Sequence, residues 1–150
     1  MKIISHRGNL FGPAPETENK PSQIDFCLSK GYDVEVDVWY ENNQWWLGHD
    51  FATYSIDLEY LLSRTKQLWV HCKNLQALDQ IFDSGLNYFW HEEDTVTLTS
   101  KKWIWTYPCK PLVGKRSIAV MPEKCDNYPF DLVKSGIGGI CTDYINRYDT

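Results

Sequence analysis

The segment Tyr-Asp-Val-Glu-Val-Asp-Val-Trp, residues 32–39, decides how we expect this chain to fold. Valine alternates strictly with a carboxylic acid, which predicts a β-strand with the valines on one face and Asp33, Glu35 and Asp37 on the other. Carboxylates two positions apart point the same way, about 6.5–7 Å apart along the strand. Like charges this close inside a protein are costly unless a cation neutralises them. We therefore expect Glu35 and Asp37 to bind a metal ion, and Asp33 to be structural or solvated.

Shorter apolar runs on both sides of this segment alternate with helical patterns about every 20–30 residues, which predicts βα units and a mostly parallel sheet. Helices are expected from about Asn19, from Leu75, near 58–62 and near 130–134. The 150 residues are expected to form one domain, spanning 1–150. The other expected core strands cover 2–5, 67–70, 86–90, 103–106, 117–121 and 138–142, and residues 45–48 form the returning arm of a hairpin.

Charge and composition exclude several classes of partner. The net charge is −5 and no stretch concentrates Lys and Arg, so duplex nucleic acid and anionic membranes are not expected to bind. No stretch approaches the ~20 apolar residues of a membrane span, and no apolar signal-peptide region follows Met1. The five cysteines are odd in number and scattered, which predicts reduced thiols and a cytoplasmic protein.

All four histidines lie where strands are expected to end. His6, His71 and His91 each follow a predicted parallel strand, and His49 follows the hairpin's returning arm. In parallel α/β architectures the carboxyl ends of the strands share the edge that carries the active site. A histidine at such a place is often structural, but His6 and His49 lie in polar loops, beside Arg7-Gly8 and Asp50 respectively.

A cation held by carboxylates, two histidines and an arginine are suited to phosphoryl transfer. The metal and the arginine neutralise charge on the phosphate oxygens, one histidine deprotonates the attacking oxygen and the other protonates the leaving oxygen. Oxygen ligands favour Mg²⁺ or Ca²⁺.

A family resemblance supports this interpretation. Four short motifs occur in order along the first third of the chain: His6-Arg7-Gly8, Glu18-Asn19, Glu35-x-Asp37 and His49-Asp50. In order and spacing they resemble the glycerophosphodiester phosphodiesterase family. The segment Gly-Ile-Cys-Thr-Asp-Tyr, residues 139–144, and the pair Trp105-Thr106 look like that family's late strands.

The resemblance implies an α/β fold, a TIM (β/α) barrel of the phosphatidylinositol-phospholipase-C-like type, with a divalent cation and two histidines as general acid and base. By position, His6 and His49 are the implied catalytic residues, and Glu35 and Asp37 the metal ligands. The implied phosphate- or substrate-binding residues are Arg7, Glu18, which would complete the metal site or bind its water, and Trp105.

The chain departs from the family pattern in three respects. His71 stands where members carry a third carboxylate ligand, which would shift the metal preference towards Mn²⁺ or Zn²⁺, while Lys73 matches and could reach a phosphate. The chain is also short against the ~250 residues of a full barrel, so we expect a compact, abbreviated barrel with some helices missing. The family's inserted lid is reduced here to about residues 51–57.

We therefore expect metal-dependent hydrolysis of a small glycerol-, inositol- or sugar-type phosphodiester, with a cyclic phosphate as a conceivable intermediate. Three alternatives stay open: a sphingomyelinase-D-like lyase that stops at the cyclic product, a non-catalytic barrel that binds phosphorylated ligands, and a zinc hydrolase that uses His71 and His91. A homodimer is also conceivable.

Overall fold

A computed structural model describes residues 1–126, 128 and 131–149. The strands in this part are β1 (Lys2–His6), β2 (Asp33–Glu41), β3 (Gln44–Leu47), β4 (Tyr54–Ile56), β5 (Leu68–Cys72), β6 (Asn87–Phe89), β7 (Val96–Leu98), β8 (Ile104–Thr106), β9 (Ser117–Val120) and β10 (Gly139–Thr142). The α-helices are α1 (Pro21–Ser29), α2 (Leu58–Leu62) and α3 (Leu75–Gln80), and two single 3₁₀ turns are η1 (Pro122–Lys124) and η2 (Ile145–Arg147).

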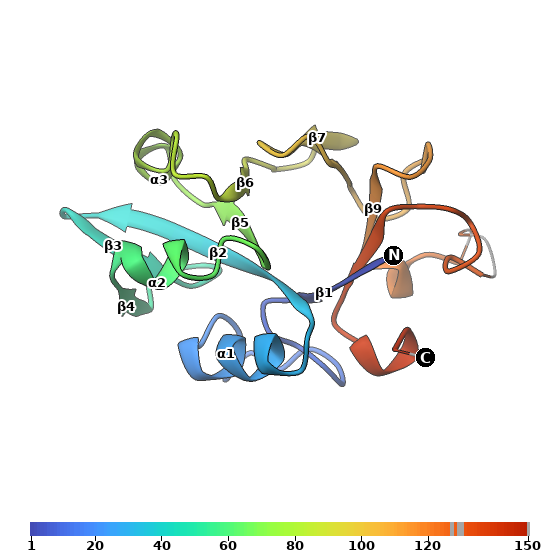
Figure 1. The fold of residues 1–150 in the computed structure, drawn as a ribbon, viewed down its shortest axis with the longest axis horizontal. Helices are drawn as coiled ribbons and strands as arrows, with labels where there is room; N and C mark the ends of the chain where they lie inside the picture. The colour runs from blue at the N-terminus through green and yellow to red at the C-terminus, as the bar shows by residue number, and fades with distance from the viewer. Residues whose placement is uncertain (127, 129–130, 150) are drawn as a thin grey trace.

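Seven of these strands run parallel, in the order β8-β9-β10-β1-β2-β5-β6. The sheet curls so that β5 and β9 face each other across its interior (Figure 1). β3 pairs antiparallel with the carboxyl-terminal part of β2, and β4 pairs antiparallel with β3. At the other edge, β7 pairs antiparallel with β8. Because parallel strands share one carboxyl edge, the residues after β1, β5, β6 and β10 meet there.

The prediction of an abbreviated TIM barrel is wrong. That fold needs eight strand–helix repeats, whereas the described residues contain three short α-helices of 9, 5 and 6 residues in a sheet-dominated, curled half-barrel. The helices lie along β1, β2 and β5, and within the described residues no α-helix covers the side formed by β7, β8 and β9 (Figure 1). The physical reason lies in the connections, since the segment between β8 and β9 is rich in Pro, Gly and Lys and carries no apolar stripe.

Two helix predictions need a further correction. The first helix begins at Pro21 with Lys20 as its N-cap, and not at Asn19, whose φ of 58° lies in the left-handed region. The short helix predicted near 130–134 begins outside the described residues, and residues 132–136 form turns.

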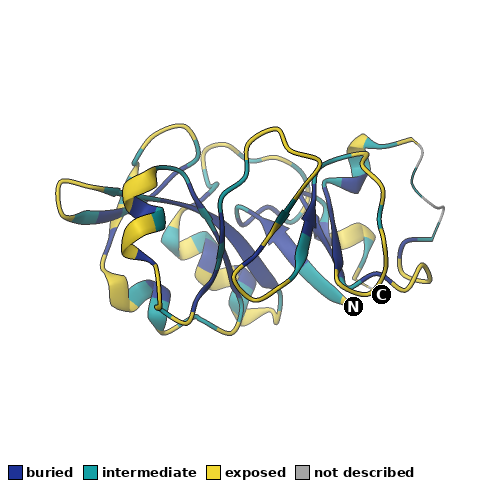
Figure 2. Ribbon diagram, turned by 90° about the horizontal axis from the view of Figure 1, so that it is seen from above, coloured by how far each residue is buried: buried dark blue, intermediate teal, exposed yellow. Residues whose placement is uncertain are grey.

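Residues 33–38 of β2 are buried on both faces of the sheet, and this explains the alternation in that strand. Val34, Val36 and Val38 pack on the outer side, in a core shared with α1 and α3. Glu35 and Asp37 point to the inner side and are 2% and 0% exposed. Figure 2 shows the strands dark blue and much of the helix surface yellow. The predicted strand therefore carries its two carboxylates into the interior.

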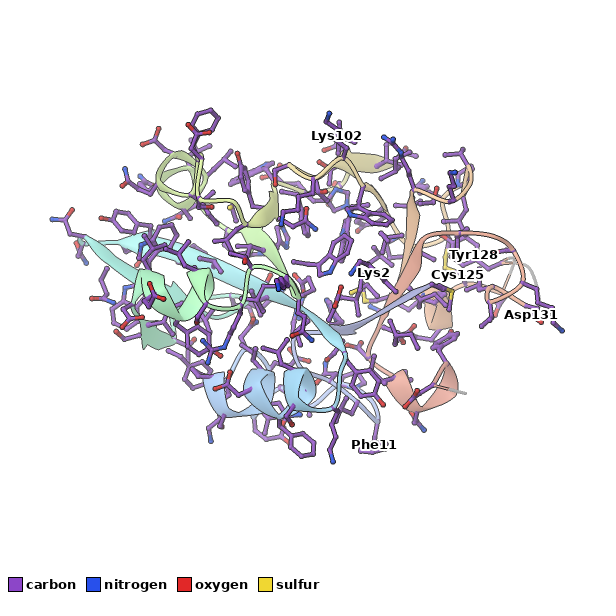
Figure 3. The ribbon with its side chains drawn as sticks, in the orientation of Figure 1. Lys2, Phe11, Lys102, Cys125, Tyr128 and Asp131 are labelled. Carbon is purple, nitrogen blue, oxygen red and sulfur yellow. A yellow bond between two sulfur atoms is a disulfide. The ribbon has the colours of Figure 1, made fainter. Side chains whose placement is uncertain are left out.

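A partly buried polar contact lies at the amino-terminal end of the interior. Lys2 Nζ lies 2.6 Å from Asp33 Oδ2, and the Trp69 indole donates to the same oxygen at 3.0 Å. Lys2, labelled in Figure 3, thus reaches into the curl from β1. Asp33 has a structural role at this end of the sheet.

The prediction that all five cysteines are reduced thiols is wrong for two of them. Cys109 and Cys125 form a disulfide, and Figure 3 labels Cys125. The other three cysteines are free and buried. The cytoplasmic location drawn from reduced thiols stays a prediction. Within the described residues, no helix has the length and apolar character required to cross a membrane.

Candidate functional site

A cavity of about 390 Å³ opens at the carboxyl edge of the parallel strands. Seven of the nine predicted site residues line it; Asp37 lies beside this lining and Glu18 lies behind Arg7. Further lining comes from the segment after β6 and from the loops after β8 and β9. The lining residues are His6, Arg7, Glu35, His49, His71, Lys73, His91, Glu92, Glu93, Trp105, Tyr107, Pro108, Val120 and Met121.

The inner carboxylates form the base of this site. Glu35 Oε2 and Asp37 Oδ1 are buried and have no hydrogen-bond partner. Three side chains each place one possible ligand atom within 4.8 Å of the other two: Glu35, Asp37 and His71. This buried group could hold a metal ion. Strand register produces it, because β2 pairs with β5 so that Asp37 stands opposite His71.

The two carboxylates differ in pKa because their surroundings differ. Burial and the nearby charge of Asp37 raise the pKa of Glu35. Burial also acts to raise the pKa of Asp37, but the contacts with His49, His71 and Arg7 outweigh it and hold that pKa well below its ordinary value. Asp37 is thus the firmly ionised member of the pair.

His71 is oriented by the backbone of His91. Its Nε2 lies 2.9 Å from the His91 carbonyl oxygen, and its ring stacks on Phe89 with centroids 5.0 Å apart. Nδ1 lies 3.2 Å from Asp37 Oδ1 and 3.7 Å from Glu35 Oε1. The imidazole therefore presents one nitrogen to the carboxylate pair.

His6 is held by Asp143, which directly follows β10. His6 Nδ1 lies 2.7 Å from Asp143 Oδ1, and His6 Nε2 lies 3.9 Å from Glu35 Oε2. Burial lowers the pKa of His6, but the Asp143 hydrogen bond and the Glu35 charge outweigh it, so the net shift is upward. The pKa of Asp143 is lowered by the same contact, although burial opposes this.

His49 lies at the mouth of the cavity, with a side chain 36% exposed. Arg7 Nη2 lies 3.3 Å from His49 Nε2, and His49 Nδ1 lies 3.4 Å from Asp37 Oδ2. The preceding Gly48 has φ of 152°, and a Cβ there would lie 2.0 Å from the Phe51 carbonyl oxygen. Only glycine allows the tight turn that returns His49 to the site.

Arg7 and Glu18 are joined beside the carboxylates. Arg7 Nη1 donates to Glu18 Oε2 at 3.3 Å, and Arg7 Nε lies 3.1 Å from Asp37 Oδ2. Asn9 Nδ2 donates to Glu18 Oε1 and to Asp143 Oδ1, both at 2.8 Å. Asn9 thus connects the residues around Arg7 with the His6–Asp143 pair.

The two remaining predicted residues occupy different parts of the cavity. Lys73 Nζ lies 3.9 Å from Asp37 Oδ1, above the carboxylates. Trp105 is 4% exposed and packs on Phe89 and Trp69, so it forms a wall of the cavity.

His91 also lines the cavity, and neither of its ring nitrogens has a hydrogen-bond partner. Among the described residues, the group that could hold a metal contains His71 but not His91.

Sequence reasoning assigned no role to several residues that hold the site together. Asp143 follows a predicted strand, so the rule applied to the histidines would also have found it. Asn19 donates to Asp37 Oδ2 at 2.8 Å and accepts from the Asp37 backbone N–H at 2.9 Å. Glu123 accepts from Thr142 and from the Asp143 N–H, each at 2.9 Å, and no signal in the sequence marks it.

No family model, curated protein or solved structure matches the chain. The likeness to glycerophosphodiester phosphodiesterases therefore depends on the motifs given above.

Proposed function

We propose that this protein is a metal-dependent phosphodiesterase, in which His49 is the general base and His6 the general acid. One observation carries the proposal: two histidines adjoin one buried carboxylate pair, and a different partner holds each of them. His6 bonds to the Asp143 carboxylate, whereas His49 Nε2 faces the Arg7 guanidinium. Acid/base cleavage of an ester requires such a difference.

His49 suits the role of base because of its contact with Arg7. A guanidinium can only donate hydrogen bonds, so His49 Nε2 must accept, which leaves the imidazole neutral with its proton on Nδ1. That proton faces Asp37 Oδ2 at 3.4 Å. Once a bound phosphate draws Arg7 away from His49, Nε2 is free to accept a proton from the attacking water or hydroxyl, and the Asp37 charge stabilises the imidazolium that forms. This is the part an orienting carboxylate plays beside a histidine base.

His6 suits the role of acid for the complementary reason. Its Nδ1 donates to Asp143, and the carboxylates of Asp143 and Glu35 favour the protonated imidazole. The other ring nitrogen of His6, Nε2, lies beside the Glu35 carboxylate at the cavity. A proton on this nitrogen can pass to the leaving oxygen as the phosphorus–oxygen bond breaks.

The charges of the site support a bound cation. Glu35, Asp37, Glu18 and Asp143 outnumber the fixed cations Arg7 and Lys73, so a phosphodiester anion would be repelled. The residues fit a divalent ion, since buried oxygens of Glu35 and Asp37 lack partners. Bound to Glu35, Asp37 and His71, the ion would supply positive charge to the phosphate oxygens. Arg7 and Lys73 then orient the phosphate from the side.

The cavity favours a small substrate. A volume of about 390 Å³ accommodates one phosphodiester with a compact alcohol, such as glycerol, inositol or a sugar. Trp105 and Tyr107 offer aromatic surface to the carbon skeleton of that alcohol.

The proposal is tested by cleavage of bis(p-nitrophenyl) phosphate in Mg²⁺, Ca²⁺ or Mn²⁺. On this substrate we expect metal-dependent turnover that falls by about 10²-fold or more in His49→Ala at saturating metal, whereas a loss of that size in His6→Ala is expected only on an alkyl phosphodiester, whose leaving alcohol needs a proton. Glu59→Ala, which changes an exposed residue on α2, serves as the control and should retain full turnover. Near-full turnover of bis(p-nitrophenyl) phosphate in His49→Ala, or of a glycerol phosphodiester in His6→Ala, would overturn the proposal. Phosphate-ester binding without turnover in the wild type would indicate a binding protein instead.

A further inference from the structure

We propose that His71 makes this site selective for a first-row metal ion that accepts a nitrogen ligand, Mn²⁺ or Zn²⁺, over Mg²⁺ and Ca²⁺. The inference deepens the proposed function, on which it rests for the place of the metal. Its source is the donor set of Glu35, Asp37 and His71, which combines two carboxylates with one imidazole nitrogen.

The protonation of His71 follows from its hydrogen bond. The His91 carbonyl oxygen can only accept, so His71 Nε2 carries a proton at this contact of 2.9 Å. In the neutral imidazole, Nδ1 then holds the lone pair. Fixing the tautomer through the other ring nitrogen is how proteins orient a histidine ligand towards a metal.

That lone pair points into a group of oxygens. Nδ1 lies 3.2 Å from Asp37 Oδ1 and 3.7 Å from Glu35 Oε1, and Asp37 Oδ1 has no hydrogen-bond partner. Glu35 Oε2 likewise has none. One oxygen from each carboxylate and one imidazole nitrogen lie within 4.8 Å of one another, and such electron-rich atoms in a buried space repel each other unless a cation lies between them.

The ring of His71 has little freedom to leave this arrangement. It stacks on Phe89, and its strand is paired on both sides, with β2 and with β6. The nitrogen is therefore part of a preorganised ligand set. A nitrogen donor binds Mn²⁺ and especially Zn²⁺ more favourably than Mg²⁺ or Ca²⁺, which prefer oxygen.

A binding measurement tests the inference without any use of activity. Isothermal titration of the wild type with each metal should give affinities for Mn²⁺ and Zn²⁺ at least about tenfold above those for Mg²⁺ and Ca²⁺. His71→Asp, which supplies a third carboxylate, should reduce this preference about tenfold or more. Asp37→Asn should lose Mn²⁺ binding and so fix the location of the site. Equal wild-type affinities, or an unchanged preference in His71→Asp, would overturn the inference.

A spectroscopic measurement on the wild type keeps the test valid if His71→Asp fails to fold. Electron spin-echo envelope modulation of bound Mn²⁺ should show coupling to a directly bound ¹⁴N nucleus, which changes to the ¹⁵N pattern when histidine is labelled. Bound Mn²⁺ without nitrogen coupling would contradict a role for His71. If the protein prefers Mn²⁺ and shows nitrogen coupling but cleaves no phosphodiester, the proposed function alone is refuted. If it cleaves phosphodiesters equally well with all four metals, this inference alone is refuted.

Discussion

His6 and Asp143 stand almost at opposite ends of the chain, yet His6 Nδ1 lies 2.7 Å from Asp143 Oδ1. Parallel pairing of β1 with β10 brings them together, since both residues lie at the carboxyl ends of neighbouring strands. Asp143 also accepts from Asn9 and is anchored through its backbone N–H to Glu123. The pair is thus fixed from both sides, and its charge acts on the proton that we assign to the general acid.

Replacement of Asp143 by Asn should alter the pH profile of cleavage. The pKa of His6 is raised, and the acid acts while protonated, so activity is present at low pH and declines as pH rises through that pKa. Removal of the Asp143 charge lowers the pKa of His6, and the alkaline limb should move to lower pH by about one unit or more. The pH dependence of kcat/KM measures this.

The matched control for this profile is Asp79→Asn, which changes an exposed aspartate on α3 and should leave both limbs in place. An alkaline limb that stays where it is in Asp143→Asn, or that moves upward, would show that His6 is not the acid.

Gly48→Ala should damage the site through the backbone. The added methyl group would meet the Phe51 carbonyl oxygen at 2.0 Å, so the turn must shift and carry His49 with it. We expect a loss of turnover larger than any loss of stability explains. Gly85→Ala is the control, since Gly85 also has positive φ but its new Cβ would meet nothing within 4 Å. Gly85→Ala should cost about 1 kcal/mol of stability and keep the turnover of the folded protein. Equal turnover in the two variants would contradict this role for Gly48.

Reduction of the Cys109–Cys125 disulfide should destabilise the protein. The bond spans 16 residues, and closure of a loop of this length contributes roughly 3 kcal/mol by limiting the unfolded chain. Urea unfolding with and without a reductant measures the difference. The Cys109→Ser/Cys125→Ser double variant should match the reduced wild type and not respond to reductant. A wild type with the same midpoint in both conditions would exclude a stabilising bond.

The sequence predicted which residues meet at the cavity better than it predicted the architecture around them. Alternation in residues 32–39 is a local property, and it placed Glu35 and Asp37 on one buried face. The strand-end rule gathered His6, His49, His71 and Lys73 at one cavity, because parallel strands bring their carboxyl ends together regardless of which helices cover them. The TIM barrel failed because it was inferred from short motifs, and these fix strand ends but not the length of each connection.

Other features depended on contacts between distant segments. Asn19 resembles a helix cap in sequence, yet its side chain bonds to Asp37 in β2. Cys109 and Cys125 are separated by a segment without a disulfide pattern, and only the fold of the loops after β8 and β9 brings them together. Glu123 acts through Asp143, which no local pattern reveals.

The most direct test of the account compares leaving groups in the two histidine variants. A p-nitrophenolate leaving group needs little protonation, whereas an alkyl alcohol needs a general acid. With saturating metal, His6→Ala should therefore lose about 10²-fold or more on a glycerol phosphodiester and much less on bis(p-nitrophenyl) phosphate, while His49→Ala should lose a similar factor on both. Equal losses on both substrates in His6→Ala, or the leaving-group dependence in His49→Ala instead, would contradict the assignment of acid and base.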